Sequence, residues 1–319
     1  MSESSITPPP PPIPPLQTSQ RDHIRELITI AESEESSRIR DVRHQCRQIV
    51  DQISATEDEG GIQKDEITWV MCNTPVKPLM QGNAPRCGLV ALSMAASVPT
   101  FKHQHIQLDN HHNNETELSE LLTLAQRRGY SKHGEMLSAF YLSALAEDFY
   151  DLHSEVTCDT LSAKEKVLNH LLQGCPILVP YDSGPNHEPC LVNGRKAHWA
   201  VISGFLCGFC DEEYNWEEFK SFAHVIGNDD MMHLLYSIEN PSEVNITLPK
   251  NIQDHIYLLV KQSKSRHTAV WSLNALEKSN CNLFEFGRKK GESINNFVLP
   301  EGGLREGLNG KLVFLTNKK

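Results

Sequence analysis

The hydrophobic pattern changes about halfway along the chain, from helical spacing to short apolar runs. In the first half, apolar residues recur every three or four positions, which is the period of a helix with a buried face. This spacing predicts helices over residues 88–96, 117–130 and 133–150. A fourth helix is expected over residues 165–175, with Gly174 near its end.

Beyond residue 175 the pattern becomes a series of β-rich runs separated by turns. These runs predict strands at residues 176–182, 198–206, 255–262, 268–273 and 311–317, and an earlier run predicts one at 67–73. Helices therefore come mostly first and strands mostly later. This order favours an α+β domain with a helical lobe and an antiparallel sheet lobe.

The sequence predicts that the N-terminal 60 residues lie outside the main domain. Residues 1–20 are rich in proline, and Pro8–Leu16 contains too many prolines for a helix interior, so we expect a disordered polyproline II tail. Such a segment can also bind an aromatic-lined groove of the SH3, WW or profilin type. Residues 21–60 predict a helical arm followed by an acidic linker, and residues 61–319 the main domain.

Composition narrows the class of protein. The formal net charge of −11 disfavours nucleic acid as a partner. The sequence contains no run of 18 apolar residues, so we expect no membrane-spanning helix, and the N-terminus does not resemble a secretory signal. An odd number of cysteines, nine, argues against a full disulfide framework, so we expect a cytosolic protein.

One cysteine stands where reactive thiols are found. Cys87 immediately precedes the apolar helix predicted over residues 88–96, and the unpaired N–H groups of a helix N-terminus lower the pKa of a thiol. Gln81, six residues upstream across a turn, can donate a hydrogen bond to an oxyanion beside the sulfur. His198, at the start of a predicted strand, can serve as the general base. The alternatives are a buried structural cysteine, a loop glutamine and a structural histidine.

Zinc chemistry is a weaker alternative. His133 and Glu135 with Cys207 and Cys210 resemble part of the zinc deaminase pattern, but Leu206 stands where proline is expected and the spacing is long. A single C-x-x-C pair is a weak zinc signal, so we expect no metal or other cofactor. A non-catalytic adaptor that uses the proline tract is a further alternative.

Five stretches together resemble the actin maturation proteases, which are papain-like cysteine peptidases related to the C39 type. They are QGNAPRCGLVALSMA, GYSKHGEMLSA, PILVPYD, HEPCLVNGRKAHWAVISGFL and LLVKQSKSRHTAVWSL. The resemblance covers roughly residues 67–319, and the proline-rich N-terminus also looks like that family.

The resemblance implies a cysteine aminopeptidase that removes the N-acetylated first residue, Met or Cys, from immature actin. It implies Cys87 as nucleophile, His198 as base and then acid, and Gln81 as oxyanion donor. It also implies delivery to profilin-bound actin through Pro8–Leu16. A cysteine peptidase of other specificity, deubiquitinase-like or an endopeptidase, is the alternative within this class.

Two features of the site stay open at the level of sequence. The group that orients His198 can be Gln262, Asp182 or a backbone carbonyl, since no acid stands where C39-type relatives have an aspartate. Because the acidic chain cannot attract an acidic substrate at long range, we expect a local basic rim formed by Arg86, Arg195 and Lys196.

Overall fold

The computed structural model describes most of the chain beyond residue 36. The described residues are 37–53, 67–101, 114–210, 214–219, 223–225, 235–239, 247–249, 252–288, 291 and 293–318. Residues 42–319 form one compact unit. The expected proline-rich tail, the first part of the helical arm and the acidic linker after residue 53 lie outside the described residues.

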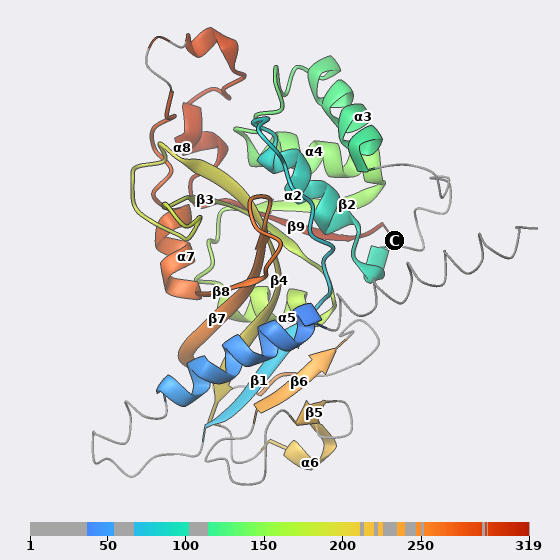
Figure 1. Cartoon of the computed structure of the whole chain (residues 1–319), viewed down its shortest axis with the longest axis vertical. Helices are drawn as coiled ribbons and strands as arrows, with labels where there is room; N and C mark the ends of the chain where they lie inside the picture. Colours follow the sequence, from blue (N-terminus) through green and yellow to red (C-terminus); the bar gives the residue numbers. More distant parts are fainter. Residues whose placement is uncertain are drawn as a thin grey trace, which may run out of the picture. The chain divides into compact units, whose positions relative to one another are not determined.

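The structure has a helix near each of the four positions predicted between residues 88 and 175 (Figure 1). After a helix over residues 37–53 come α2 (Cys87–Ala96), η1 (Pro99–Phe101), α3 (Asn114–Arg127), α4 (Ala139–Tyr150), α5 (Lys164–Leu172), α6 (Trp216–Phe219), α7 (Leu273–Asn280), η3 (Ile294–Asn296) and α8 (Gly303–Gly307). Helix α5 ends before Gly174, whose φ of +72° is the left-handed conformation that glycine adopts readily.

The described strands form one nine-stranded sheet. They are β1 (Thr68–Asn73), β2 (Leu152–Thr157), β3 (Ile177–Asp182), β4 (Ala197–Phe209), β5 (His224–Val225), β6 (Leu235–Glu239), β7 (Ile252–Gln262), β8 (Ala269–Ser272) and β9 (Leu312–Asn317). The main order is β2-β9-β3-β4-β1-β6-β5, and β7 pairs with both β4 and β8. All pairs are antiparallel except β1 with β6, which is parallel.

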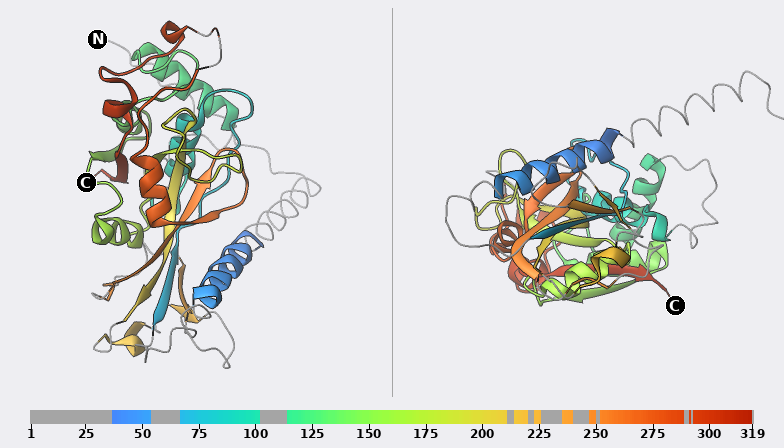
Figure 2. Two further views of the ribbon diagram at one scale, coloured as in Figure 1. Left: turned by 90° about the vertical axis from the view of Figure 1, so that its left-hand side faces the viewer. Right: turned by 90° about the horizontal axis from the view of Figure 1, so that it is seen from below.

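The long strand β4 organises both faces of the sheet. Trp199 and Val201 belong to the core that the sheet forms with α2, α3 and α4. Ala200 and Ile202 point to the opposite face, where α5 and α7 pack. Residues 42–53 lie against β1 and the far end of β4 (blue in Figure 2). Because side chains alternate along a strand, one strand can serve both cores.

The α+β prediction is confirmed, with corrections to individual elements. The helix predicted from His133 starts only at Ala139, because residues 131–135 form a turn and Ser138 caps the helix by accepting from the Tyr141 N–H. Strands β2, β5 and β6 and helices α6, α7 and α8 were not predicted. Helices pack on both faces of a single sheet. Within the described part of the chain, no helix is long and apolar enough to cross a membrane.

Candidate functional site

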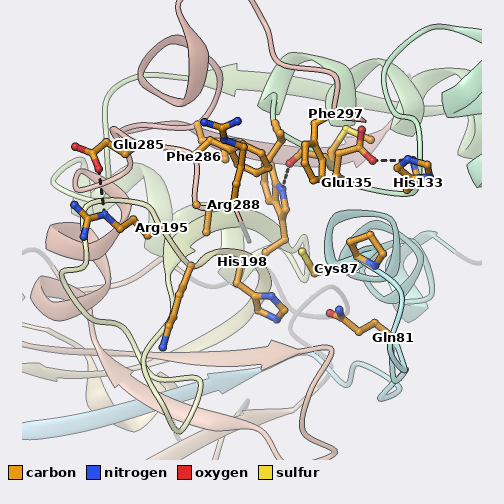
Figure 3. Close-up of a pocket in the computed structure, with 18 of the residues that line it drawn as sticks. Gln81, Cys87, His133, Glu135, Arg195, His198, Glu285, Phe286, Arg288 and Phe297 are labelled. Carbon is orange, nitrogen blue, oxygen red and sulfur yellow. Dashed lines mark hydrogen bonds and ion pairs between the residues drawn. The ribbon is translucent and has the colours of Figure 1, made fainter. Parts of the chain in front are cut away.

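A cleft of about 1290 Å³ lies beside the N-terminus of α2 (Figure 3). It brings together Gln81, Cys87 and His198, the three residues singled out from the sequence. Residues 195–199 of the β4 region form one side of the cleft, and residues 133–137, residues 285–288, Gly291 and Phe297 contribute further walls. The cleft therefore joins the start of α2 to the start of β4.

Helix α2 brings Cys87 up to the sheet because Gly88 has no side chain. A Cβ atom on Gly88 would lie 2.6 Å from Met136 Cβ, closer than carbon atoms approach, and 3.0 Å from Trp199 Cδ1, which is tighter than an ordinary contact. The Trp199 indole in turn donates from Nε1 to the Met136 carbonyl at 2.7 Å. Gly88, Met136 and Trp199 thus fix the distance between the helix and β4.

The Cys87 thiol is free and partly exposed. Burial raises its pKa, while the backbone N–H groups of Trp199, Gly88 and Cys87 and the charge of Lys264 act to lower it. The helix N-terminus was expected to dominate, but burial of the sulfur outweighs it. Contact with the Trp199 backbone places the sulfur directly beside the residue that follows His198 on β4.

His198 is 9% exposed and lies opposite Tyr181 of β3 in the sheet. Burial lowers its pKa to about 4, with smaller contributions from the neighbouring His187 and Lys264. The Tyr181 ring packs edge-on against the imidazole at 5.8 Å between centroids. The imidazole is therefore neutral at pH 7 and able to accept a proton.

Gln81 is 6% exposed and is held at both ends of its side chain. Its Nε2 group donates to the Ala84 carbonyl at 2.9 Å, and its Oε1 accepts from the Ser263 hydroxyl at 2.5 Å. Since Ala84 O can only accept, these partners define which end of the amide is nitrogen. The amide nitrogen has two hydrogens, and Ala84 takes one.

Three consecutive residues at the end of β7 contact the site. Gln262 lies opposite Ala200 on β4 and hydrogen-bonds to His198 through its side chain, which raises the pKa of the imidazole slightly against the effect of burial. Ser263 Oγ lies 3.5 Å from His198 Nε2. Lys264 donates from Nζ to the Gly82 carbonyl at 2.9 Å.

Asp182, the other candidate for orienting His198, is fully buried but serves a different segment. Its Oδ2 accepts from the backbone N–H of Val192 at 2.5 Å and of Gly194 at 3.0 Å, and from the Asn282 amide at 3.0 Å. It pairs with Ala197, whereas His198 pairs with Tyr181, so the two side chains leave opposite faces of the sheet. Asp182 organises the loop before β4.

The remaining cleft wall combines aromatic and charged groups. Phe286 and Phe297 pack edge to face at 4.7 Å between ring centroids, and both line the cleft. Arg195 and Lys196 line it as expected, although Arg195 forms an ion pair with Glu285 at 3.1 Å. Arg86, by contrast, is not among the residues that line the cleft, and its guanidinium forms an ion pair with Glu115 at 3.0 Å.

The residues of the zinc alternative lie on separate elements. His133 and Glu135 belong to the turn before α4, where the Glu135 carboxylate accepts from the N–H groups of Lys132, His133 and Val298. Cys207 is buried in β4. Among the residues that the structure describes, no group of three or more His, Cys, Asp or Glu side chains is placed to hold a metal ion.

Sequence reasoning missed several residues of the site. Lys264, His187 and the pair Phe286 and Phe297 carry no local signal, because each follows or interrupts an ordinary polar segment. Ser263 stood beside Gln262 in the sequence, but its hydroxyl had no assigned role. Only the fold brings residue 263 next to residue 81.

Comparisons with known proteins give one consistent family. The model of the actin maturation protease-like C-terminal domain matches residues 76–206. The chain is 35% identical to the actin maturation protease of Xenopus tropicalis over 79% of this chain and 76% of that protein. It is 33% identical to the Danio rerio protein, over 81% and 77%, and 30% identical to the Homo sapiens protein, over 79% and 67%. No solved structure matches the chain significantly.

Proposed function

The chain belongs to the actin maturation protease family, and we propose that it is a cysteine aminopeptidase that removes the N-acetylated first residue, Met or Cys, from immature actin. One observation carries the chemical part of this proposal. A free thiol at a helix N-terminus, a neutral buried imidazole and a side-chain amide share one cleft. The order of cysteine on a helix and histidine on a later strand supports a papain-like arrangement, which we assign to residues 61–319.

The first half of the reaction acylates the enzyme. Cys87 Sγ attacks the carbonyl carbon of the acetylated residue while His198 takes the thiol proton. Gln81 Nε2 and the Cys87 backbone N–H donate to the oxyanion that forms. The carbon–nitrogen bond then breaks, and His198 returns the proton to the leaving amine of the shortened actin chain.

The second half releases the product. Water attacks the thioester while His198 accepts its proton, the carbon–sulfur bond breaks, and the proton returns to the thiolate. The products are an N-acetyl amino acid and the free enzyme. Since burial raises the pKa of the Cys87 thiol and lowers that of His198, the resting pair is neutral, and the proton moves as the sulfur attacks.

We assign the orientation of His198 to Gln262. Its side chain hydrogen-bonds to the imidazole, whereas the carboxylate of Asp182 is occupied by the loop before β4. The basic pair Arg195 and Lys196 suits the acidic residues that follow the first residue of immature actin. We also propose that Pro8–Leu16 binds profilin in the cytosol, which rests on the sequence alone.

The test is cleavage of acetylated actin peptides of the Met-Asp and Cys-Asp types, followed by mass spectrometry. We expect loss of one acetylated residue by the wild type and no loss by Cys87→Ala. A Cys87→Ala protein that processed the peptides or intact actin at the normal rate would overturn the mechanism. Cleavage of internal bonds in control peptides would instead indicate an endopeptidase. Pull-down of profilin with and without residues 1–16 tests the proline tract separately.

A further inference from the structure

Ser263 is a buried residue that contacts both Gln81, in the segment before α2, and His198 of β4. Its side chain has no exposed surface, and it directly follows the last residue of β7. Its backbone carbonyl accepts from the Gln81 N–H at 3.1 Å, and its hydroxyl donates to Gln81 Oε1 at 2.5 Å. One residue therefore holds both the backbone and the side chain of Gln81, which is 182 positions away in the sequence.

The same hydroxyl reaches the histidine. Ser263 Oγ lies 3.5 Å from His198 Nε2. A serine hydroxyl has one hydrogen, and the short contact to Gln81 Oε1, an atom that can only accept, uses it. The oxygen that faces His198 thus presents a lone pair, which suits an imidazole protonated on Nε2. In that tautomer Nδ1 is the nitrogen that is free to accept a proton.

We infer that Ser263 is a positioning residue that couples Gln81 to His198 through its single hydroxyl. With Oε1 held by Ser263 and one Nε2 hydrogen held by Ala84, the remaining Nε2 hydrogen has a fixed direction. A preorganised donor stabilises an oxyanion better than one that must reorient during the reaction. The inference rests on the proposed function, since it assigns Ser263 a role in that same reaction.

A double-mutant cycle tests the coupling. We expect Ser263→Ala to lower kcat for acetylated peptides by roughly 10- to 100-fold with KM within about twofold, less than the ~10²–10³-fold effect of removing an oxyanion donor outright in Gln81→Ala. In the Gln81→Ala background, Ser263→Ala should lose most of its effect, because residues that act through one another are not additive. Ser263→Thr, which keeps the hydroxyl, should recover part of the activity.

Ser203→Ala is the matched control. Ser203 is also a buried serine of the sheet, 2% exposed, and its hydroxyl makes only a long 3.5 Å contact to the Leu259 carbonyl. The Ser203→Ala substitution should leave kcat and KM unchanged. Full additivity of Ser263→Ala and Gln81→Ala, or a kcat for Ser263→Ala equal to the wild type, would overturn the inference while leaving the proposed function intact.

If the wild-type protein cleaves no peptide, a second measurement tests the role of Ser263 separately from the proposed substrate. Alkylation of Cys87 by iodoacetamide needs no substrate and reports on the base beside the thiol. We expect Ser263→Ala to slow it about 3- to 10-fold at pH 7 and to shift its pH profile, as a positioned base accelerates proton transfer. An unchanged rate and profile would refute the contact with His198. Absence of peptide cleavage with a changed profile would refute only the substrate assignment.

Discussion

Replacing Gly88 by alanine should disable the site while leaving the fold largely intact. The new Cβ would lie 2.6 Å from Met136 Cβ and 3.0 Å from Trp199 Cδ1. Carbon atoms in contact are about 3.5–4.0 Å apart, so the start of α2 must move by about 1 Å. Cys87 is the neighbouring residue and moves with it, away from the Trp199 backbone and His198.

Gly88→Ala should affect stability and activity to different extents. Overpacking a tight contact costs about 1–3 kcal/mol, but alanine is about 1 kcal/mol better than glycine inside a helix, so the net loss of stability should be ~0–2 kcal/mol. Misplacing a catalytic group by 1 Å costs roughly 10²-fold in rate. Activity should therefore fall much further than stability.

The assay compares kcat/KM on an acetylated peptide with urea unfolding of the same preparations. Gly129→Ala is the control: its φ of +72° strains alanine by about 1–2 kcal/mol, yet a Cβ there meets no atom within 4 Å and Gly129 does not line the cleft. It should lose stability and keep activity. A Gly88→Ala enzyme with kcat/KM within twofold of wild type would refute the argument that Gly88 sets the position of Cys87.

Three further predictions concern pH, packing and charge. Burial lowers the pKa of His170 to about 4, so the stability it contributes is complete above pH 6.5 and should fall by about 3 kcal/mol as the pH drops to 4. His170→Gln should therefore make the free energy of unfolding less dependent on pH between 6.5 and 4, and a pH dependence equal to that of the wild type would contradict this. Asp182→Asn should cost about 3 kcal/mol in thermal unfolding, because an amide presents N–H groups to the donors of the loop; a loss below 0.5 kcal/mol would argue against that role. The double substitution Arg195→Glu and Lys196→Glu should raise KM for acidic peptides several-fold at low salt and by a smaller factor at high salt. A double mutant whose KM equals that of the wild type at both salt concentrations would exclude a basic rim.

Elements whose hydrophobic spacing is undisturbed could be predicted from the sequence. Helix α2 and strands β3, β4 and β9 are almost wholly buried, so their apolar runs stand out. Strand β2 was missed because it reads LHSEVT and alternates buried with exposed polar residues. Helix α7 was missed because it has only eight residues and directly follows β8, so the strand predicted over residues 268–273 ran into its first residue.

The residues to which we assign the chemistry could be named from the sequence, but the contacts that position them could not. Cys87 and Gln81 lie close together in the chain, and His198 opens a recognisable strand. The contact of Ser263 with Gln81 joins segments 182 residues apart, so no local pattern reveals it. The turn at Glu135 likewise depends on a bond to the Val298 N–H, far along the chain.

The pKa of the Cys87 thiol shows how a correct local rule is outweighed by burial. The backbone N–H groups at the start of α2 lower the pKa, but desolvation of the sulfur between α2 and β4 raises it more. The same burial lowers the pKa of His198, so both changes favour the neutral thiol and the neutral imidazole. In the proposed reaction such a pair holds little thiolate at rest, and the attacking thiolate forms only as the proton passes to His198. Reactivity then depends on how accurately the base and the oxyanion donor are held, which places the hydrogen bonds at the end of β7 at the centre of the site.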